Sequence, residues 1–378
     1  MLQADRIANL RPHADTIVVG GGLVGSAVAY GLSLVGRKVV VLDEGDNAYR
    51  ASRGNFGLVW VQSKGHKLHD YARWTRSSAE LWTGFAERLE EETHVSPCYH
   101  KAGGVHLCFS DEELAEQRAL NDSMVKAHGD FPYGAEMLDR AALEAMLPGL
   151  GPEVVGGNWS PDDGHANPLA LLQALHEALQ KRNSIFLSCA AVHAVEYERG
   201  CFTVHSQAGI FAAPSLVLAA GLGNRELGSQ LGLNVPVWPL KGQILVTEKA
   251  PLRLGMPTNY LRQTDDGTFL IGDSHEHSGY DIRSTSPVMA SIAASGLRSF
   301  PYLAELRIIR AWAALRVMTG DGLPIYQQSE RCPGAFAVTC HSGVTLAAAH
   351  ALRLAPMISD GVLSTDIAAF SAERFSVH

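Results

Sequence analysis

Three glycines near the start of the chain have the spacing of a dinucleotide-binding turn. Gly20, Gly22 and Gly25 form the pattern G-x-G-x-x-G, and Asp43 follows 23 positions after the first of them. In such a turn the first glycine makes the bend, the second lets the backbone approach a pyrophosphate, and the third lets helix and strand pack closely. Asp43 can accept hydrogen bonds from ribose hydroxyls and would repel a 2′-phosphate, which disfavours NADP; the adjacent Glu44 is the rival for that role. The pattern leaves FAD and NAD open, and a plain glycine turn is the structural alternative.

Three further segments could contact the phosphates or ring of a nucleotide. Residues 51–57 offer small side chains, backbone N–H groups and Arg53 to a second phosphate or to a flavin edge. Residues 219–223 end a buried apolar run, where a turn facing a cofactor would lie. Residues 340–345 place a glycine turn before a helix, which is a site for an anion or a carbonyl oxygen. A surface turn or a simple helix cap is the alternative for these segments.

The elements that must position these segments follow from the apolar pattern. A buried strand at 16–19, a small-residue helix at 23–35 and a second strand at 38–42 put the first glycine turn between strand and helix, with a right-handed parallel crossover. The remaining pattern predicts helices at 78–92 and 111–128, a helix beginning at Asn167-Pro168, short strands over 185–220, antiparallel strands over 236–273, a helix at 287–300, and a strand at 335–338 followed by a turn and helix over 342–358.

Composition excludes several classes of protein. With 378 residues the chain suggests about two domains, and 46% hydrophobic with 19% charged residues is an ordinary globular balance. The net charge of −8 argues against nucleic-acid binding. Six scattered cysteines without a C-x-x-C pair fit reduced thiols in the cytoplasm and argue against a zinc site or iron–sulfur cluster held by this chain alone. No run is long and apolar enough for a membrane span, and the glycines after Ile17 disfavour a signal peptide behind Arg6 and Arg11.

The segments taken together resemble the D-amino-acid-oxidase-like FAD-dependent oxidoreductases, the group that includes glycine oxidase and sarcosine oxidase. The resemblance runs from residue 16 to about residue 361 and rests on seven pieces in order: IVVGGGLVGSAVAYGL, VVVLDEGD, ASRGNFGLVW, LVLAAGLGN, PLKGQILVTE, RAWAALRVMTGDGLPIY and CHSGVTLAAAHALRL. More narrowly, ASRGNFGLVWVQSKG and CHSGVTLAAAHA look like the β subunits of heteromeric, dye-linked opine and D-hydroxyproline dehydrogenases.

The resemblance implies an α/β fold in two parts. A Rossmann-like FAD-binding domain would consist of residues 1–95, 155–235 and 312–378. A substrate-binding domain of α+β type, with an antiparallel sheet, would consist of residues 96–154 and 236–311.

The resemblance also implies a cofactor and its contacts. FAD would bind non-covalently, because Cys340 stands where many monomeric members carry glycine, a departure that matches the multi-subunit group. Val192 would lie by the adenine, and residues 343–345 by the pyrimidine edge of the flavin. The predicted cofactor-binding residues are Gly20, Gly22, Leu23, Val24, Gly25, Asp43, Glu44, Ser52, Arg53, Gly54, Asn55, Phe56, Gly57, Val192, Ala220, Gly221, His341, Ser342, Gly343, Val344 and Thr345.

Two residues match positions near the substrate in the family. Arg316 matches an arginine that grips the substrate carboxylate, and a guanidinium suits that task because it donates in a planar fork; a surface ion pair is the alternative. Tyr260 could donate to the carboxylate or cap the pocket, or be a packed core tyrosine. His341 could tune the flavin or make a structural hydrogen bond, and the Lys241–Gln243 strand points to a domain junction. The cluster 275–277 invites a metal site, but no second cluster has ligand spacing, and we predict none.

The resulting prediction is an FAD-dependent dehydrogenase that oxidises the Cα–N bond of an amino acid with a secondary amine, D-hydroxyproline or an opine, by hydride transfer to flavin N5. It would be the catalytic β subunit of an assembly that is cytoplasmic or peripheral to the inner membrane. The partner, an electron-transfer subunit, would carry FMN and an iron–sulfur cluster. The alternatives are a stand-alone amino-acid oxidase that uses oxygen, a flavin-binding electron-transfer or structural subunit, and, more distantly, an NAD-dependent dehydrogenase.

Overall fold

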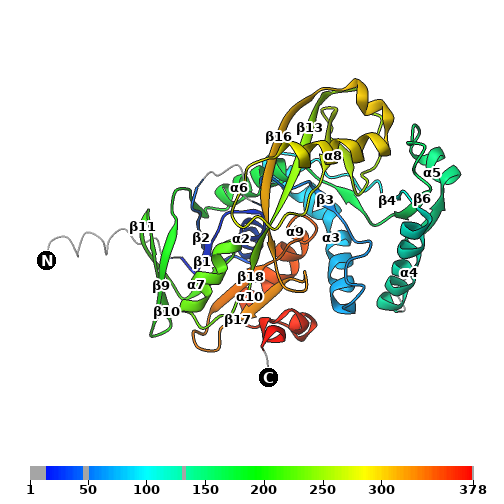
Figure 1. The fold of residues 1–378 in the computed structure, drawn as a ribbon. Coiled ribbons are helices and arrows are strands. Elements are labelled where there is room, and N and C mark those ends of the chain that lie inside the picture. Colours follow the sequence, from blue (N-terminus) through cyan, green and yellow to red (C-terminus); the bar gives the residue numbers. More distant parts are fainter. Residues whose placement is uncertain (1–13, 46–50, 130–132, 377–378) are drawn as a thin grey trace.

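A computed structural model describes residues 14–45, 51–129 and 133–376 of the chain (Figure 1). Arg6 and Arg11, which raised the signal-peptide alternative, lie outside the described residues. Within those ranges no helix combines the length and the apolar character that a bilayer crossing requires. All six cysteines are unpaired.

A six-stranded sheet forms the centre of the larger part of the molecule. Its order is β17-β18-β12-β1-β2-β8, and every neighbouring pair is parallel except β17 with β18. The strands are β1 (Thr16–Val19), β2 (Val39–Leu42), β8 (Ile185–Leu187), β12 (Ser215–Leu218), β17 (Ile325–Gln328) and β18 (Ala335–Thr339). Every residue of β1, β2 and β18 is buried, as expected for strands covered on both faces. The predicted strand–turn–helix–strand unit and the Rossmann-like fold are confirmed.

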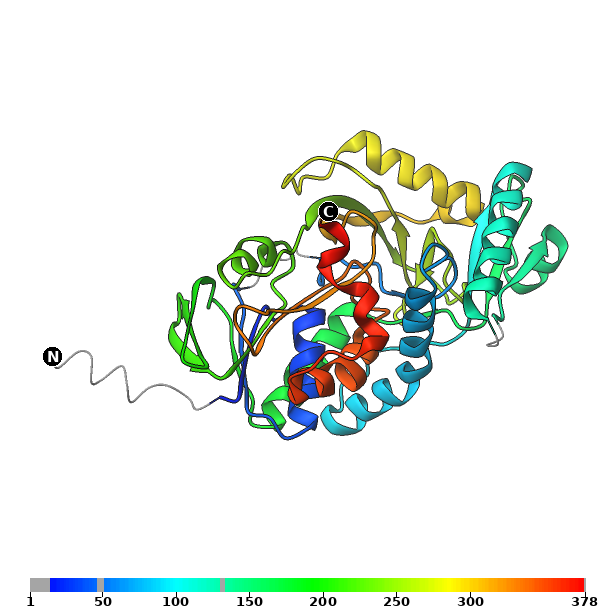
Figure 2. The ribbon, with the colours of Figure 1, turned by 90° about the horizontal axis from the view of Figure 1, so that it is seen from below.

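Helices from both ends of the chain cover one face of this sheet (Figure 2). Helix α2 packs against α6 and against the C-terminal helical segment, where a Cβ at Gly31 would lie 2.0 Å from the carbonyl oxygen of Ala351. Asn167 caps α6 with its side chain, and Pro168 follows at the first helical position, as predicted. The helices of this part are α2 (Leu23–Leu34), α3 (His69–Thr93), α6 (Pro168–Lys181), α7 (Asn224–Gln230), α9 (Ala347–Ala349), a π-helical turn (His350–Leu354) and α10 (Ala355–Asp360).

An antiparallel sheet of order β14-β15-β13-β16 forms the second part, with α8 (Ser286–Ser299) packed against it. Its strands are β13 (Trp238–Lys249), β14 (Leu261–Gln263), β15 (Thr268–Gly272) and β16 (Ile308–Met318). Beside it lies a three-stranded sheet of β4 (Gly104–Cys108), β6 (Gly156–Ser160) and β5 (Glu136–Asp139), with helices α4 (Asp111–His128) and α5 (Arg140–Met146) (Figure 1). The predicted antiparallel sheet is confirmed.

Two strands do not follow the predicted division into domains. β6 pairs with both β4 and β5, although the predicted boundary at 154/155 puts it in the FAD-binding domain. β16 runs through the boundary at 311/312 and reaches from one part of the molecule to the other. No element was predicted over β16, and the predicted start of α3 lies nine residues after its observed start at His69. The two-domain division itself stays a prediction. Short strands complete the fold: β3 (Leu58–Val59), β7 (Gly164–His165), β9 (Val192–Glu198), β10 (Cys201–Ser206) and β11 (Gly209–Ala213).

Candidate active site

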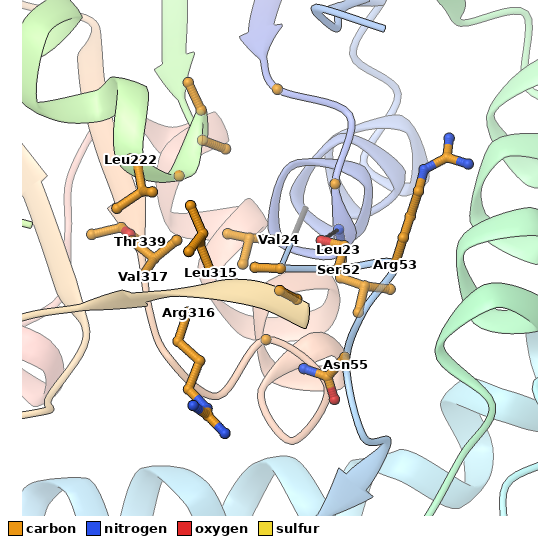
Figure 3. Close-up of a pocket in the computed structure, with 18 of the residues that line it drawn as sticks. Leu23, Val24, Ser52, Arg53, Asn55, Leu222, Leu315, Arg316, Val317 and Thr339 are labelled. Atoms are coloured by element: carbon orange, nitrogen blue, oxygen red, sulfur yellow. Dashed lines mark hydrogen bonds between the residues drawn. The ribbon is translucent and has the colours of Figure 1, made fainter. Parts of the chain in front are cut away.

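A single cavity of about 1240 Å³ brings the predicted segments together (Figure 3). It lies where the carboxyl ends of β1, β2, β12 and β18 meet β13 and β16, the place where open parallel sheets bind ligands. Its volume exceeds the ~300–1,000 Å³ of most small-molecule pockets. All of the predicted site residues line it except Gly25, Gly57 and Tyr260.

The glycine turn is shaped by close backbone contacts. Gly20 has φ of +102°, and a Cβ there would lie 2.4 Å from the carbonyl oxygen of Ala219. A Cβ on Gly25 would lie 1.9 Å from the carbonyl oxygen of Gly20, so Gly25 packs the helix onto the turn, behind the cavity, as its position in the pattern predicts. The Oγ of Ser52 accepts a hydrogen bond from the N–H of Leu23 at 2.9 Å. A hydroxyl therefore lies at the N-terminus of α2, where an anion is favoured.

Asp43 ties the second strand to this turn. Its Oδ2 accepts from the N–H of Gly21 at 2.7 Å, and its Oδ1 accepts from the N–H of Gly45 at 3.0 Å. Asp43 and Glu44 both line the cavity, so both remain candidates for the ribose contact. His176 also lines it and contacts the carbonyl oxygen of Gly21 at 3.1 Å. Burial lowers the pKa of His176, which favours its neutral form. No motif marked His176 in the sequence.

The loop at 51–57 is held against the antiparallel sheet. A Cβ on Gly54 would lie 2.4 Å from the Cβ of Ala314, and Trp312 Nε1 donates to the carbonyl oxygen of Gly54 at 3.2 Å. Arg262 donates to the carbonyl oxygen of Phe56. Gly57 does not line the cavity. Its φ of +97° and the close approach of its backbone to Ala166 show that it shapes the turn. These contacts fix the loop on β14 and β16, and in Figure 3 the side chain of Arg53 extends away from the other labelled side chains.

The C-terminal loop is also rigidly held. Ser342 Oγ receives a hydrogen bond from Lys64 Nζ at 2.6 Å and lies 3.0 Å from Tyr71 Oη. Trp82 Nε1 donates to the carbonyl oxygens of Val344 and Thr345, both at 3.1 Å. The loop is therefore anchored to α3 and to the segment before it. Those anchors satisfy the carbonyl oxygens of Val344 and Thr345, and the N–H groups of Leu346 and Ala347 donate to the carbonyl oxygens of Ser342 and Val344.

Lys64 belongs to the piece ASRGNFGLVWVQSKG but was given no role from the sequence, and it lines the same cavity. Burial, the largest cause, lowers the pKa of Lys64 to about 8. Burial together with the positive charges of Lys64 and Arg316 lowers the pKa of His341 to about 3, so His341 is neutral at pH 7. Burial raises the pKa of the Cys340 thiol to about 12, which makes it a poor nucleophile. A lone lysine after a turn carries no local signal that could have marked it.

Arg316 is placed in the cavity by strand alternation. Leu315 and Val317 point to one side of β16, and Arg316 points to the other (Figure 3). Its Nη1 donates to the carbonyl oxygen of Ser274 at 2.8 Å, and its Nη2 forms an ion pair with Asp273. The side chain keeps 17% of its surface exposed. The ion pair foreseen as the alternative is therefore present, but it lies in the cavity, where a ligand carboxylate could compete for the guanidinium.

Comparison with known proteins identifies the chain. A family model described as FAD dependent oxidoreductase matches residues 15–357. This chain belongs to that family. It is 43% identical to the B subunit of opine oxidase from Rhizobium meliloti over 364 residues, which are 96% of this chain and 98% of that protein. It is 42% identical, with the same coverage, to the B subunit of opine oxidase from Agrobacterium tumefaciens (strain Ach5). Among solved structures, glycine oxidase from Geobacillus kaustophilus superposes with a TM-score of 0.89 at 22% identity, covering 97% of this chain and 100% of that one.

The cavity of this FAD-dependent oxidoreductase fits the family's cofactor. Glycines stand where a Cβ would fill the turn, the α2 N-terminus faces the space, and the volume is large enough for an extended dinucleotide. FAD, when bound, supplies the acceptor for a hydride. The identification confirms the predicted enzyme class and cofactor, and it overrides the NAD-dependent alternative. The individual FAD contacts stay predictions.

Tyr260 does not join the other predicted residues of the oxidoreductase. Its ring packs 5.6 Å from the ring of Phe109, within an apolar cluster of the second part, and burial raises its pKa. This placement supports the core-tyrosine alternative and not the predicted contact with substrate. In the 275–277 cluster, Glu276 accepts from Lys241, Gln243 and Ser274, and the described ranges contain no group of three or more potential metal ligands.

Proposed function

We propose that the protein is the FAD-bearing catalytic subunit of a multi-subunit dehydrogenase, and that its substrate is an amino acid with a secondary amine, an opine or D-hydroxyproline. The observation that carries the proposal is the position of Arg316 in the cavity that the cofactor loops line. A guanidinium there can hold a substrate carboxylate and so position the adjoining Cα–H. The near full-length similarity to the B subunits of two opine oxidases supports both the substrate class and the subunit role.

The chemistry needs little from the protein beyond position and a dry cavity. A neutral secondary amine that loses a hydride from Cα becomes an iminium, and the two electrons leave with the hydride. Loss of the N–H proton to water then gives the imine, so no general base is required at Cα. His341 is neutral at pH 7 because its pKa is lowered to about 3, so it adds no positive charge against the iminium. Arg316 holds the carboxylate that is attached to the carbon that loses the hydride.

Electron transfer away from the chain is part of the proposal. Both opine oxidase relatives are named as subunits of a larger enzyme, and the six cysteines here are unpaired and scattered. We propose a partner with FMN and an iron–sulfur cluster, a location in the cytoplasm or at the inner membrane, and non-covalent FAD. The raised pKa of the Cys340 thiol supports the last point, because a thiol that stays protonated does not attack the flavin ring.

One experiment tests this function. The chain is purified with its co-encoded partners, and opines, D-hydroxyproline, D-amino acids and sarcosine are screened with an artificial dye acceptor. We expect reduction of the dye with a secondary-amine amino acid, and little or none with primary D-amino acids. Turnover with primary D-amino acids alone would refute the proposed substrate class.

A second candidate is a stand-alone amino-acid oxidase that passes electrons to oxygen. It is favoured by the 25% identity to glycine oxidase of Bacillus licheniformis over 97% of this chain. Hydrogen peroxide formation by the isolated, FAD-loaded chain at the turnover of the assembly would establish it. A third candidate, a subunit that holds flavin without a substrate site, requires that Arg316→Ala keep full activity in a complex that still holds FAD.

A further inference from the structure

Lys64 is a cation in the cavity without a carboxylate partner. Within residues 14–45, 51–129 and 133–376 no ion pair to its Nζ is found, and the ammonium donates to the hydroxyl of Ser342 at 2.6 Å. Arg316, in contrast, is paired with Asp273 in the same cavity. A buried cation without a counterion is costly unless a ligand supplies the missing charge.

The groups around Lys64 do not supply that charge. Asp163 is the carboxylic acid whose charge acts on it, but its carboxylate already accepts from the N–H groups of Val61 and Gln62 and from Gln62 Nε2. Burial raises the pKa of Asp163 to about 7, so near neutral pH its negative charge is only partly present. The Cys340 thiol stays protonated, because its pKa is raised to about 12. The positive charge of Lys64 therefore faces the cavity.

Lys64 and Arg316 both act on the loop that carries His341. Both line the cavity, and both lower the pKa of His341, which lies within electrostatic reach of each. They come from different elements, since Lys64 precedes α3 and Arg316 stands on β16. Near the neutral imidazole of His341 the cavity thus offers two cationic groups, and of these two only Arg316 forms an ion pair with a carboxylate in the part of the chain that the structure describes.

We propose that Lys64 binds a second carboxylate of the substrate, so that the site is built for an N-(carboxyalkyl) amino acid with a carboxylate on each side of its secondary amine. Arg316 holds the carboxylate beside the carbon that is oxidised, and Lys64 holds the one on the N-substituent. This inference rests on the proposed function and selects between its two substrate classes, because D-hydroxyproline has a single carboxylate.

The test compares two amines that differ by one carboxylate: N-(1-carboxyethyl)-L-alanine and N-ethyl-L-alanine. The full chain with its partners, loaded with FAD, is titrated anaerobically with each, and Kd from the flavin absorbance change is measured beside KM and kcat for dye reduction. For Lys64→Met we expect Kd and KM for the dicarboxylate to rise about 10- to 100-fold, the range of a charge-assisted contact in a partly buried site. Values for the monocarboxylate should change less than about threefold, and Lys64→Arg should restore most of the preference.

Lys67→Met is the matched control, because Lys67 lies three residues later and is exposed. In this variant Kd and KM for both amines should be unchanged. An equal rise in Kd and KM for both amines in Lys64→Met, or no rise for either amine, overturns the proposal. A lowered reduction potential of the bound FAD with the dicarboxylate preference unchanged also overturns it, and would assign Lys64 to the flavin. Failure of wild-type protein to oxidise any secondary-amine amino acid refutes the proposed function, whereas the Kd comparison still decides whether Lys64 binds the second carboxylate.

A measurement on the wild-type chain covers the case in which Lys64→Met does not fold. The preference in Kd for the dicarboxylate should fall as pH rises from 7.5 to 9, because Lys64 loses its charge near pH 8. The titratable groups that face Lys64 are Asp163, Tyr71, Cys340 and His341. Tyr71 and Cys340 have raised pKa values and stay neutral over this range, His341 stays neutral with its lowered pKa, and Asp163 is already mostly ionised at its start. A preference that is constant to pH 9 overturns the proposal.

Discussion

The two ends of the cavity differ in whether backbone or side-chain atoms line them. At the end near β1 and β2, the walls are backbone: Gly20 and Gly25 approach neighbouring carbonyls to within distances that no Cβ allows, and Asp43 braces the turn through main-chain N–H groups. At the end near β16, the walls are partly buried polar and charged side chains. Lys64, His341 and Arg316 meet there from three segments far apart in the sequence.

This difference explains how each end responds to change. A wall of backbone cannot tolerate added atoms, so its failures are steric and affect folding and cofactor binding together. At a wall of charged side chains, a substitution of similar shape is tolerated only if it keeps the charge. Variants there should therefore change the affinity for substrate and its pH dependence. Variants at the two ends should therefore separate into loss of stability at one and loss of selectivity at the other.

The largest effect is expected at Gly25, at the backbone end. Gly25→Ala puts a methyl group 1.9 Å from the carbonyl oxygen of Gly20, so helix and turn must separate. We expect the free energy of unfolding to fall by about 3 kcal/mol or more, together with loss of bound FAD. Chemical denaturation and the flavin absorbance of the purified protein measure both.

Gly84→Ala is the control for this substitution, because Gly84 lies in helix α3 with nothing within 4 Å of its added Cβ. It should keep FAD and gain roughly 0.5–1 kcal/mol from helix propensity. If Gly25→Ala retains FAD and full stability, the turn accommodates the methyl group. The proposed difference between the two ends of the cavity is then wrong.

Arg316 tests the side-chain end. In Arg316→Met we expect kcat/KM for a secondary-amine amino acid to fall about 100-fold or more, since the carboxylate loses a charged donor and Asp273 loses its partner. FAD content should be unchanged. Arg310→Met on the same strand, where the side chain is exposed, should keep wild-type kinetics. Wild-type kcat/KM in Arg316→Met would show that the substrate does not bind at this end of the cavity.

The same difference decides what could be predicted from the sequence. The backbone end was predicted well, because Gly20, Gly22 and Gly25 act on neighbours within one strand–turn–helix unit, and the parallel sheet follows from it. Arg316 was found only through family resemblance. Lys64 and Asp273 were not among the predicted site residues, and Tyr260 does not line the cavity, because a side chain's direction into a cavity depends on pairing between distant strands, and β16 itself was not predicted. The predicted boundary at 311/312, which falls inside β16, was drawn for the same reason.

A smaller effect is expected at Asp163, which holds the segment before Lys64. Burial raises its pKa to about 7, above the ordinary ~3.9 of the unfolded chain. Between pH 4 and 7 the folded protein keeps a proton that the unfolded chain releases, so this group lowers stability as pH rises through that window. In Asp163→Asn that contribution disappears: relative to the variant, wild-type protein should lose about 2 kcal/mol of unfolding free energy from pH 5 to pH 7. Urea denaturation at both pH values measures it, and parallel pH profiles would contradict it.

The smallest effect is expected at Asp273, where the charge of Arg316 is partly satisfied by the chain itself. A substrate carboxylate must compete with Asp273 for the guanidinium, while the carbonyl oxygen of Ser274 still accepts from Nη1 and keeps the group in place. In Asp273→Asn we therefore expect KM to fall about 3- to 10-fold with kcat within about twofold, the size expected for a partly exposed ion pair. Asp360→Asn, an exposed acid that does not line the cavity, controls for net charge. A rise in KM would instead make Asp273 the group that orients Arg316, and the side-chain end would then depend on rigid positioning as strictly as the backbone end does.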